Sequence, residues 1–266
     1  MASRSATTSS DPIAARFASL RDAGRKALVV YCTAGHPTAD ASLALLRGLE
    51  GAGADIVEVG VPFSDPMADG PIIQASSQRA LDQGMTFAGT LELIGRARLA
   101  IPVVLFTYLN PLLAAGEDAL ARAAKAGAHG VLVTDLPLGA DADLEARIAK
   151  SPLAFIRLAA PTTPAARMRA IASHGRGFVY LISRLGVTGL QAGVATELPE
   201  TIARLRGVTD LPICVGFGIS TPAQAREAAR LADGVVVGSA LVKAAGESVA
   251  QALALVAAMR AALDAA

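Results

Sequence analysis

The sequence predicts an α/β fold, a single (β/α)8 barrel of the TIM type with one extra helix near the N-terminus. Strand-like and helix-like stretches alternate along nearly the whole chain, with eight strand-like runs. These runs are continuously apolar, which is typical of parallel strands covered on both faces. No linker divides the 266 residues, a length that α/β barrels commonly reach as one domain. We therefore expect residues 11–266 to form one barrel domain and residues 1–10 to be a flexible tail.

The expected barrel strands share a composition of apolar and β-branched residues, and are residues 28–33, 55–60, 102–108, 130–135, 153–158, 177–182, 211–215 and 234–237. The stretches between them have helical spacing, for example residues 39–51, 117–126 and 221–231. The extra helix is expected near residues 12–23. Asp40, Asp141 and Thr221 are expected helix starts. A doubly wound open sheet is the alternative that this pattern leaves.

The composition excludes several classes of function. A net charge of +1 offers no basic field for nucleic acid, and no apolar run approaches the length of a membrane span. The N-terminal stretch has no apolar signal segment, and Cys32 and Cys214 lie in apolar runs, so we expect a cytoplasmic protein with reduced thiols. A cleaved organellar segment is the alternative for the N-terminal stretch. No metal site is expected, because His36, His129 and His174 lack the spacing of metal ligands.

Glu58 is the first candidate for chemistry, because barrel active sites lie at the carboxyl ends of the strands. It sits near the end of the second expected strand, where a period of two places it on the same face as Ile56. Val57 and Val59 then face the helices. Burial of an inward carboxyl raises its pKa toward a value useful for proton transfer. The alternative is an outward Glu58 in a structural salt bridge.

The loop that follows, VPFSDPMADGP, places Asp65 and Asp69 among three prolines and a glycine. Two carboxylates in a stiff loop directly after Glu58 make this segment a candidate part of the site. The alternative for either aspartate alone is an ordinary turn-forming residue.

Glycine-rich turns after the last two expected strands predict a phosphate site. They are VGFGIS at residues 215–220 and VGSA at residues 237–240, the second followed by an expected short helix. Glycines let backbone N–H groups approach an anion, and a helix N-terminus adds partial positive charge. A third such stretch, residues 183–189, opens a loop to about residue 196 that we interpret as a lid or a disordered segment.

Together these motifs resemble the tryptophan synthase α subunit family from about Arg16 to the C-terminus. The resemblance is carried by GADIVEVGVPFSDPMADGPIIQ and, in the same order as in the family, by YLISRLGVTG, GFGIS and GSALVK. It implies a TIM barrel that cleaves indole-3-glycerol phosphate to indole and glyceraldehyde 3-phosphate. It also implies no cofactor in this chain, and an α2β2 heterotetramer with a pyridoxal-phosphate-dependent β subunit that receives the indole.

Matched position by position, the resemblance implies roles for individual residues. Glu58 matches the acid/base, Asp69 the carboxylate that meets the indole N–H, and Tyr180 a tyrosine that lines the site. The pocket wall and its supports are matched by Tyr31, Thr33, Phe106, Tyr108 and Asp135. The lid threonine is matched by Thr188, and the phosphate cradle by Gly189, Gly218, Gly238 and Ser239. His36, Leu185 and the segment after Leu190 depart from the family pattern, which bears on partner affinity and on the lid.

The implied mechanism divides the work between two carboxyl groups. A protonated Glu58 would protonate C3 of the indole, and an ionised Asp69 would stabilise the positive charge on the ring nitrogen. The base for the retro-aldol step stays open between Glu58, a water and another residue. Other functions compatible with the sequence are a stand-alone lyase, a related sugar-phosphate isomerase barrel and a regulatory subunit without catalysis.

Overall fold

The structure is a computed structural model that describes residues 11–182, 197–216 and 218–266. Its strands are β1 Ala27–Thr33, β2 Ile56–Gly60, β3 Val103–Thr107, β4 Gly130–Val133, β5 Ala154–Phe155, β6 Arg157–Ala159, β7 Val179–Ile182, β8 Ile213–Gly216 and β9 Gly234–Val237. They form one sheet in the order β5-β4-β3-β2-β1-β9-β8-β7-β6, and every pairing is parallel. All eight predicted strands are therefore present, within a few residues of their expected bounds.

The sheet closes on itself through residues 154–159. β5 pairs with β4 and β6 pairs with β7, yet only Ile156 separates β5 from β6, and its N–H donates to the carbonyl of Val131 at 2.9 Å. These two short strands are thus consecutive pieces of the fifth barrel strand. The closed (β/α)8 barrel is confirmed, and the open doubly wound sheet is wrong.

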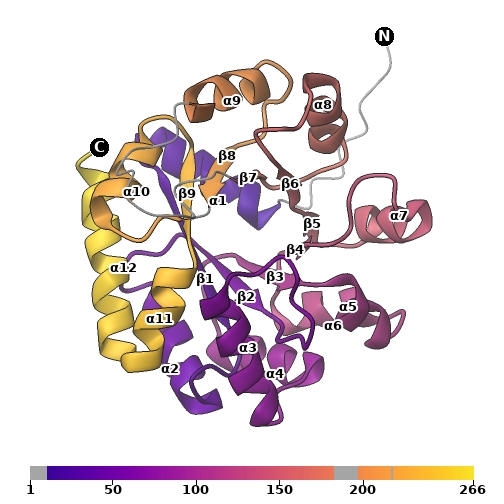
Figure 1. Cartoon of the computed structure of the whole chain (residues 1–266), viewed down its shortest axis with the longest axis vertical. Helices are drawn as coiled ribbons and strands as arrows, with labels where there is room; N and C mark the ends of the chain where they lie inside the picture. Colours follow the sequence, from indigo (N-terminus) through magenta and orange to yellow (C-terminus); the bar gives the residue numbers. More distant parts are fainter. Residues whose placement is uncertain (1–10, 183–196, 217) are drawn as a thin grey trace.

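The helices surround the barrel (Figure 1). They are α1 Pro12–Asp22, α2 Ala39–Leu49, α3 Pro71–Asp82, α4 Phe87–Ala97, α5 Leu109–Ala114, α6 Ala119–Ala126, α7 Ala142–Lys150, α8 Ala165–Ser173, α9 Glu197–Arg206, α10 Pro222–Ala229, α11 Ser239–Glu247 and α12 Val249–Asp264. The predicted extra helix is α1. Its Ile13, Phe17 and Leu20 join the apolar interior of the barrel, and the rings of Phe17 and Phe178 lie 5.7 Å apart. α1 therefore covers the end of the barrel where the strands begin.

Helix starts follow the local sequence signals with one correction. The side chain of Asp141 caps α7 by accepting from Leu144 N–H, and Thr221 forms a capping box with Gln224 at α10. The expected start at Asp40 is wrong. Thr38 caps α2, because its backbone is extended and its hydroxyl accepts from Ala41 N–H at 3.2 Å. Asp40 lies in the first turn, where negative charge favours the helix dipole.

Strand residues alternate between two apolar layers. Ile56, Val104 and Val236 belong to a cluster inside the barrel, whereas Val57 and Val59 pack between the strands and the helices. The predicted inward and outward faces of β2 are therefore confirmed.

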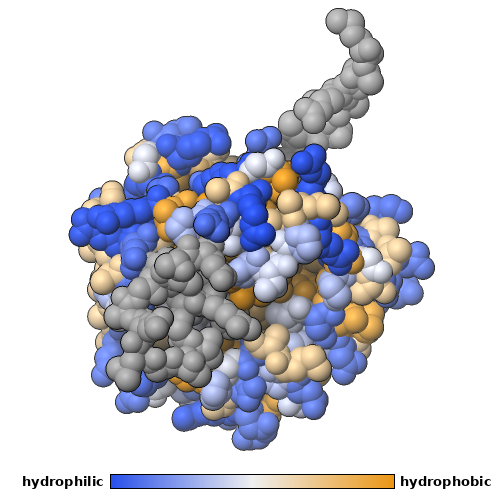
Figure 2. All heavy atoms as spheres, turned by 45° about the horizontal axis from the view of Figure 1, so that its top comes forward, coloured by the Kyte–Doolittle hydropathy of each residue, from blue (hydrophilic) through white to orange (hydrophobic). Residues whose placement is uncertain are grey.

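The outer surface is mostly hydrophilic on the face seen in Figure 2, with hydrophobic residues in small groups. The large hydrophobic residues that are exposed in the described part of the chain are Met67, Ile72 and Leu113. In that same part, no helix is both long and apolar enough to cross a membrane.

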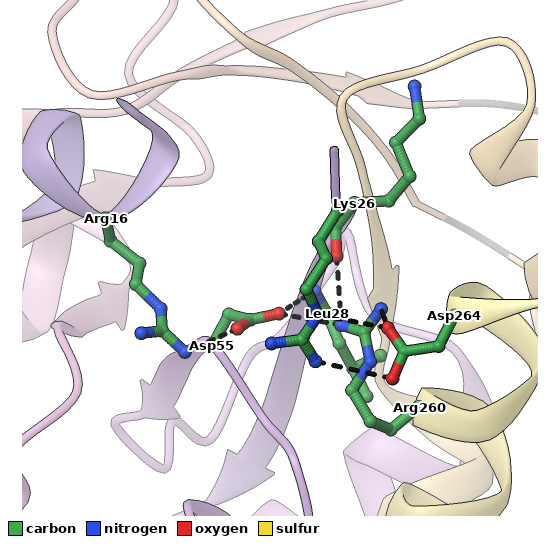
Figure 3. A network of polar contacts seen from close by, with 7 residues as sticks. Arg16, Lys26, Leu28, Asp55, Arg260 and Asp264 are labelled. Carbon is green, nitrogen blue, oxygen red and sulfur yellow. Dashed lines mark hydrogen bonds and ion pairs between the residues drawn. The ribbon is translucent and has the colours of Figure 1, made fainter. Parts of the chain in front are cut away.

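A buried carboxylate ties the two ends of the chain to the barrel (Figure 3). Asp55 is 1% exposed, accepts from Arg16 at 2.6 Å and from Leu28 N–H at 2.7 Å, and pairs with Arg260 at 3.0 Å. Arg260 in turn donates to the carbonyl of Lys26 at 2.9 Å. The charge of Asp55 is thus fully partnered, and it connects four elements of the fold, which are α1, β1, β2 and α12.

We expect Asp55→Asn to lower the free energy of unfolding by about 3 kcal/mol, because it removes the buried charge that pairs with Arg16 and Arg260 and leaves Arg260 only the exposed Asp264 as an ion-pair partner. Urea unfolding measures the change. The matched control is Asp118→Asn, which removes an exposed carboxylate paired with Arg122 and should cost less than about 1 kcal/mol. Equal losses in the two variants would contradict the structural role of Asp55.

Candidate active site

Glu58 lies inside the barrel near the end of β2, between Tyr31 of β1 and Val104 of β3 in the strand register. It is 1% exposed, and neither carboxyl oxygen has a hydrogen-bond partner in the part of the chain that the structure describes. Burial raises its pKa to about 8. The group is therefore mostly protonated at neutral pH, and the outward, salt-bridged alternative is wrong.

Asp69 lies in the loop between β2 and α3. Its backbone N–H donates to the carbonyl of Pro66 at 3.0 Å, and its carbonyl accepts from the side chain of Gln74 at 2.8 Å. Burial raises the pKa of Asp69 to about 6, against the opposing effect of a hydrogen bond from the Tyr108 hydroxyl. Asp69 is thus mostly ionised at neutral pH, and its pKa lies below that of Glu58. Asp65 is exposed and accepts from the neighbouring Ser64 hydroxyl, as a turn-forming residue does.

Tyr108 connects the Asp69 loop to the strands behind it. Its hydroxyl accepts from Ala68 N–H at 3.0 Å and donates to the Asp69 carboxylate. Its ring packs against Phe63, with centroids 5.2 Å apart. The next residue along, Leu109, donates its N–H to the carboxylate of Asp135 at 2.7 Å. Asp135 therefore supports the junction between β3 and α5.

Tyr31 and Phe106 form an aromatic wall beside Glu58. Their rings meet edge to face with centroids 5.1 Å apart, a favourable geometry for an aromatic pair. Gly60 leaves the room for this wall, because a Cβ there would lie 2.1 Å from the Tyr31 hydroxyl. The Thr33 hydroxyl contacts the buried hydroxyl of Ser76 in α3 at 2.7 Å. Sequence reasoning missed Ser76, although a serine on the apolar face of a helix is a signal for such a partner.

Tyr180 faces the interior from β7 and is 7% exposed. A Cβ at Gly216 would lie 2.2 Å from its hydroxyl, so this strand neighbour also has to be small. Burial, together with the nearby charges of Glu58 and Asp69, raises the pKa of Tyr180. The phenol therefore stays neutral. Tyr180 therefore lies within electrostatic range of both carboxyl groups.

The predicted phosphate residues that the structure describes lie after β8 and β9. Gly218 has a φ of +80°, a conformation that favours glycine. Gly238 is the N-cap of α11 without a side-chain cap, and Ser239 is the first residue of that helix. The first N–H groups of α11 are thus oriented as in an anion site. Thr188, Gly189 and the predicted lid at residues 183–196 lie outside the described residues.

No cluster of three or more metal-ligating side chains occurs among the residues that the structure describes. His129 has a structural contact instead, since its Nδ1 accepts from Val103 N–H at 3.1 Å. The site in the barrel mouth consists of carboxyl groups, phenols and aromatic rings, without a set of metal ligands in the described chain.

The sequence model for the family described as "Tryptophan synthase alpha chain" matches residues 17–265. Tryptophan synthase alpha chains from Citrifermentans bemidjiense and Geobacter sp. strain M21 are each 50% identical to this chain over 234 residues, which cover 87% of this chain and 88% of the relative.

Solved structures agree with the sequence comparison. Aminoacrylate-bound tryptophan synthase from M. tuberculosis superposes with a TM-score of 0.86 at 36% identity, covering 95% of this chain and 99% of that chain. Tryptophan synthase subunit alpha from Legionella pneumophila str. Paris superposes with a TM-score of 0.85 at 34% identity, covering 96% and 99%. The chain belongs to the tryptophan synthase alpha chain family, as the resemblance predicted, and is a lyase that cleaves indole-3-glycerol phosphate.

Proposed function

We propose that Glu58 and Asp69 carry out the cleavage of indole-3-glycerol phosphate as an acid and a counter-charge. The observation that supports this division is the burial of both carboxyl groups, which raises the pKa of Glu58 further than that of Asp69. Glu58, with a pKa of about 8, holds a proton at neutral pH, and Asp69, with a pKa of about 6, has lost its proton. Two carboxyl groups tuned apart by their surroundings are typical of acid–base catalysis.

The reaction then proceeds in two proton transfers. Glu58 donates its proton to C3 of the indole ring, and Asp69 stabilises the positive charge that develops on the ring nitrogen. The Glu58 carboxylate next takes the proton of the hydroxyl on the glycerol carbon bonded to C3. The bond between C3 and that carbon breaks, and its electron pair returns to the ring. The products are indole and glyceraldehyde 3-phosphate, and Glu58 is protonated again.

The remaining site residues bind and orient the substrate in this proposal. The indole ring is surrounded by the side chains of Tyr31, Phe106 and Tyr180. The pocket wall is supported by Thr33, Tyr108 and Asp135. The phosphate binds at Gly218, Gly238 and Ser239, together with Gly189, and Thr188 closes on the Asp69 loop. No cofactor of this chain takes part, and pyridoxal phosphate belongs to the β subunit.

The partner in this proposal is a β subunit, in an α2β2 heterotetramer in the cytoplasm. The support is a set of exposed apolar side chains on the elements that build the site. Met67 lies in the Asp69 loop, Ile72 at the start of α3 and Leu113 near the end of α5, with exposed fractions of 83%, 39% and 49%. Docking over the Asp69 loop would also align the catalytic carboxylate.

Glu58→Gln is expected to lower kcat by at least about 100-fold, because an amide of the same volume cannot transfer a proton. The Michaelis constant should change little, since the loss lies in the chemical step. Indole release by the purified variant measures both constants. A variant that keeps more than about a tenth of the wild-type rate would remove Glu58 from the acid role.

The pH dependence of kcat/KM should be bell-shaped. Activity should fall below pH 6 as Asp69 is protonated, and above pH 8 as Glu58 loses its proton. Rates of indole formation from pH 5 to 10 give the profile. A profile that is still rising between pH 8 and 10 would mean that the essential form of Glu58 is the carboxylate.

Gly238→Asp is expected to raise the Michaelis constant by about tenfold or more, because it puts negative charge where the phosphate should bind. Competitive inhibition by glycerol phosphate should weaken in parallel. The matched control is Gly207→Asp, at an exposed position after α9 where a Cβ meets no atom closer than 3.5 Å. Unchanged constants in Gly238→Asp would place the phosphate elsewhere.

Addition of a matching β subunit should raise the indole-forming rate to a plateau at equimolar chains. Met67→Asp should weaken complex formation on gel filtration, since it puts a charge into the apolar contact. A full rate without the partner, and no complex, would identify a stand-alone lyase. No cleavage in any mixture, with a complex present, would identify a regulatory subunit.

A further inference from the structure

The ion pair between Arg157 and Glu145 is buried outside the barrel interior, and the proposed mechanism does not use it. Arg157 is a residue of β6 and is 4% exposed, and Glu145 is a residue of α7 and is 8% exposed. The guanidinium lies over the ring of Phe155, with 3.9 Å between its central carbon and the ring centroid. A buried ion pair adds little net stability over an apolar pair of similar volume. Its presence here needs another explanation.

Both side chains also bind the backbone of the loop between β4 and α7, residues 134–141. A carboxylate oxygen of Glu145 accepts from Gly139 N–H at 2.6 Å, where the backbone turns with a φ of +85°. Arg157 donates to the carbonyl of Leu136 at 3.4 Å. Arg167 of α8 adds a bond to the carbonyl of Leu138 at 2.6 Å. The pair therefore anchors the loop from two sides.

The same loop leads directly to the proposed catalytic carboxylate. Asp135, next to Leu136, accepts from Leu109 N–H at 2.7 Å. Leu109 follows Tyr108, whose hydroxyl bonds both Ala68 N–H and the Asp69 side chain. A shift of the loop would thus move Asp135, the start of α5 and the hydroxyl that orients Asp69.

We propose that Arg157 and Glu145 are positioning residues that hold Asp69 in place through the 134–141 loop, Asp135 and Tyr108. The inference rests on the proposed role of Asp69 in cleavage. The Arg157 guanidinium and the Glu145 carboxylate suit this purpose, because their several donors and acceptors let them bind each other and one backbone group each.

The charges around the pair keep it ionised. Burial acts to raise the pKa of Glu145, but the Gly139 N–H and the Arg157 guanidinium outweigh it and hold that pKa below its usual value. The positive groups that also face the pair are Arg167 and His174. The Glu145 carboxylate is therefore ionised at neutral pH.

The experiment compares Arg157→Met with the double variant Arg157→Met/Glu145→Met. The single variant leaves a buried carboxylate unpaired and should be less stable, whereas the apolar double variant should recover stability. Neither variant can donate a hydrogen bond to the Leu136 carbonyl. The double variant also loses the carboxylate that accepts from Gly139 N–H. We expect kcat to fall about tenfold or more in both, with less than a twofold change in the Michaelis constant, since small misplacements of a catalytic group are costly.

Two further measurements separate positioning from stability. Loss of the Tyr108 hydrogen bond should move the acid limb of the kcat/KM profile above pH 6, because that bond favours ionised Asp69. Hydrogen exchange of the Leu109 amide should become faster. The matched control, Arg96→Met/Glu92→Met, removes an exposed ion pair of α4. It should change neither the acid limb of the kcat/KM profile nor the exchange rate of the Leu109 amide.

Recovery of kcat together with stability in the double variant would overturn the inference, because the pair would then be structural only. Unchanged Leu109 exchange in both variants would also overturn it, whatever the activity. Absence of indole release from the wild-type protein would instead overturn the proposed roles of Glu58 and Asp69. The two failures are thus distinguishable.

Discussion

Closure of the sheet through the divided fifth strand is the constraint on which the other features depend. β5 bonds to β4 and β6 bonds to β7 within six consecutive residues. A closed sheet has no free edges, and its inner face is shielded from water on every side. Every second strand residue then has to fit an interior of fixed size. The close approach of Tyr31 to Gly60, and of Tyr180 to Gly216, follows from this limited space.

Asp55 and Glu58 show how differently one barrel treats two buried carboxyl groups. Asp55 lies directly before β2 and is partnered by two arginines and a backbone N–H, so its charge supports the fold. Glu58 has no partner among the described residues. Its folded pKa of about 8 exceeds the ordinary value of 4.5, so it costs stability increasingly as the pH rises from 4.5 to 8. The barrel thus becomes less stable through the burial of Glu58, the group that we propose as the proton donor.

Much of the site could be predicted because strand ends in a barrel converge on one mouth. The period of two placed Glu58 inside, and the glycine-rich turns marked the loops after β8 and β9. The pattern could not show that Glu58 has no hydrogen-bond partner among the described residues, that Asp65 faces solvent, or that Ser76 contacts Thr33. It also could not show that Tyr108 bonds Asp69, because such contacts join residues from different βα units whose distances depend on side-chain packing. The roles of Thr188 and Gly189 stay predictions, because both residues lie outside the part of the chain that the structure describes.

The sequence by itself determined the order of elements, the inward face of β2 and the family, because hydrophobic period and loop motifs are local properties of the chain. Tertiary structure alone decided the closure at residues 154–159, the separate pKa values of Glu58 and Asp69, and the buried pair of Arg157 with Glu145. Each of these features depends on which residues, distant in the sequence, are buried next to one another. Desolvation and ion pairing act through space, and their strength is set only when the barrel closes.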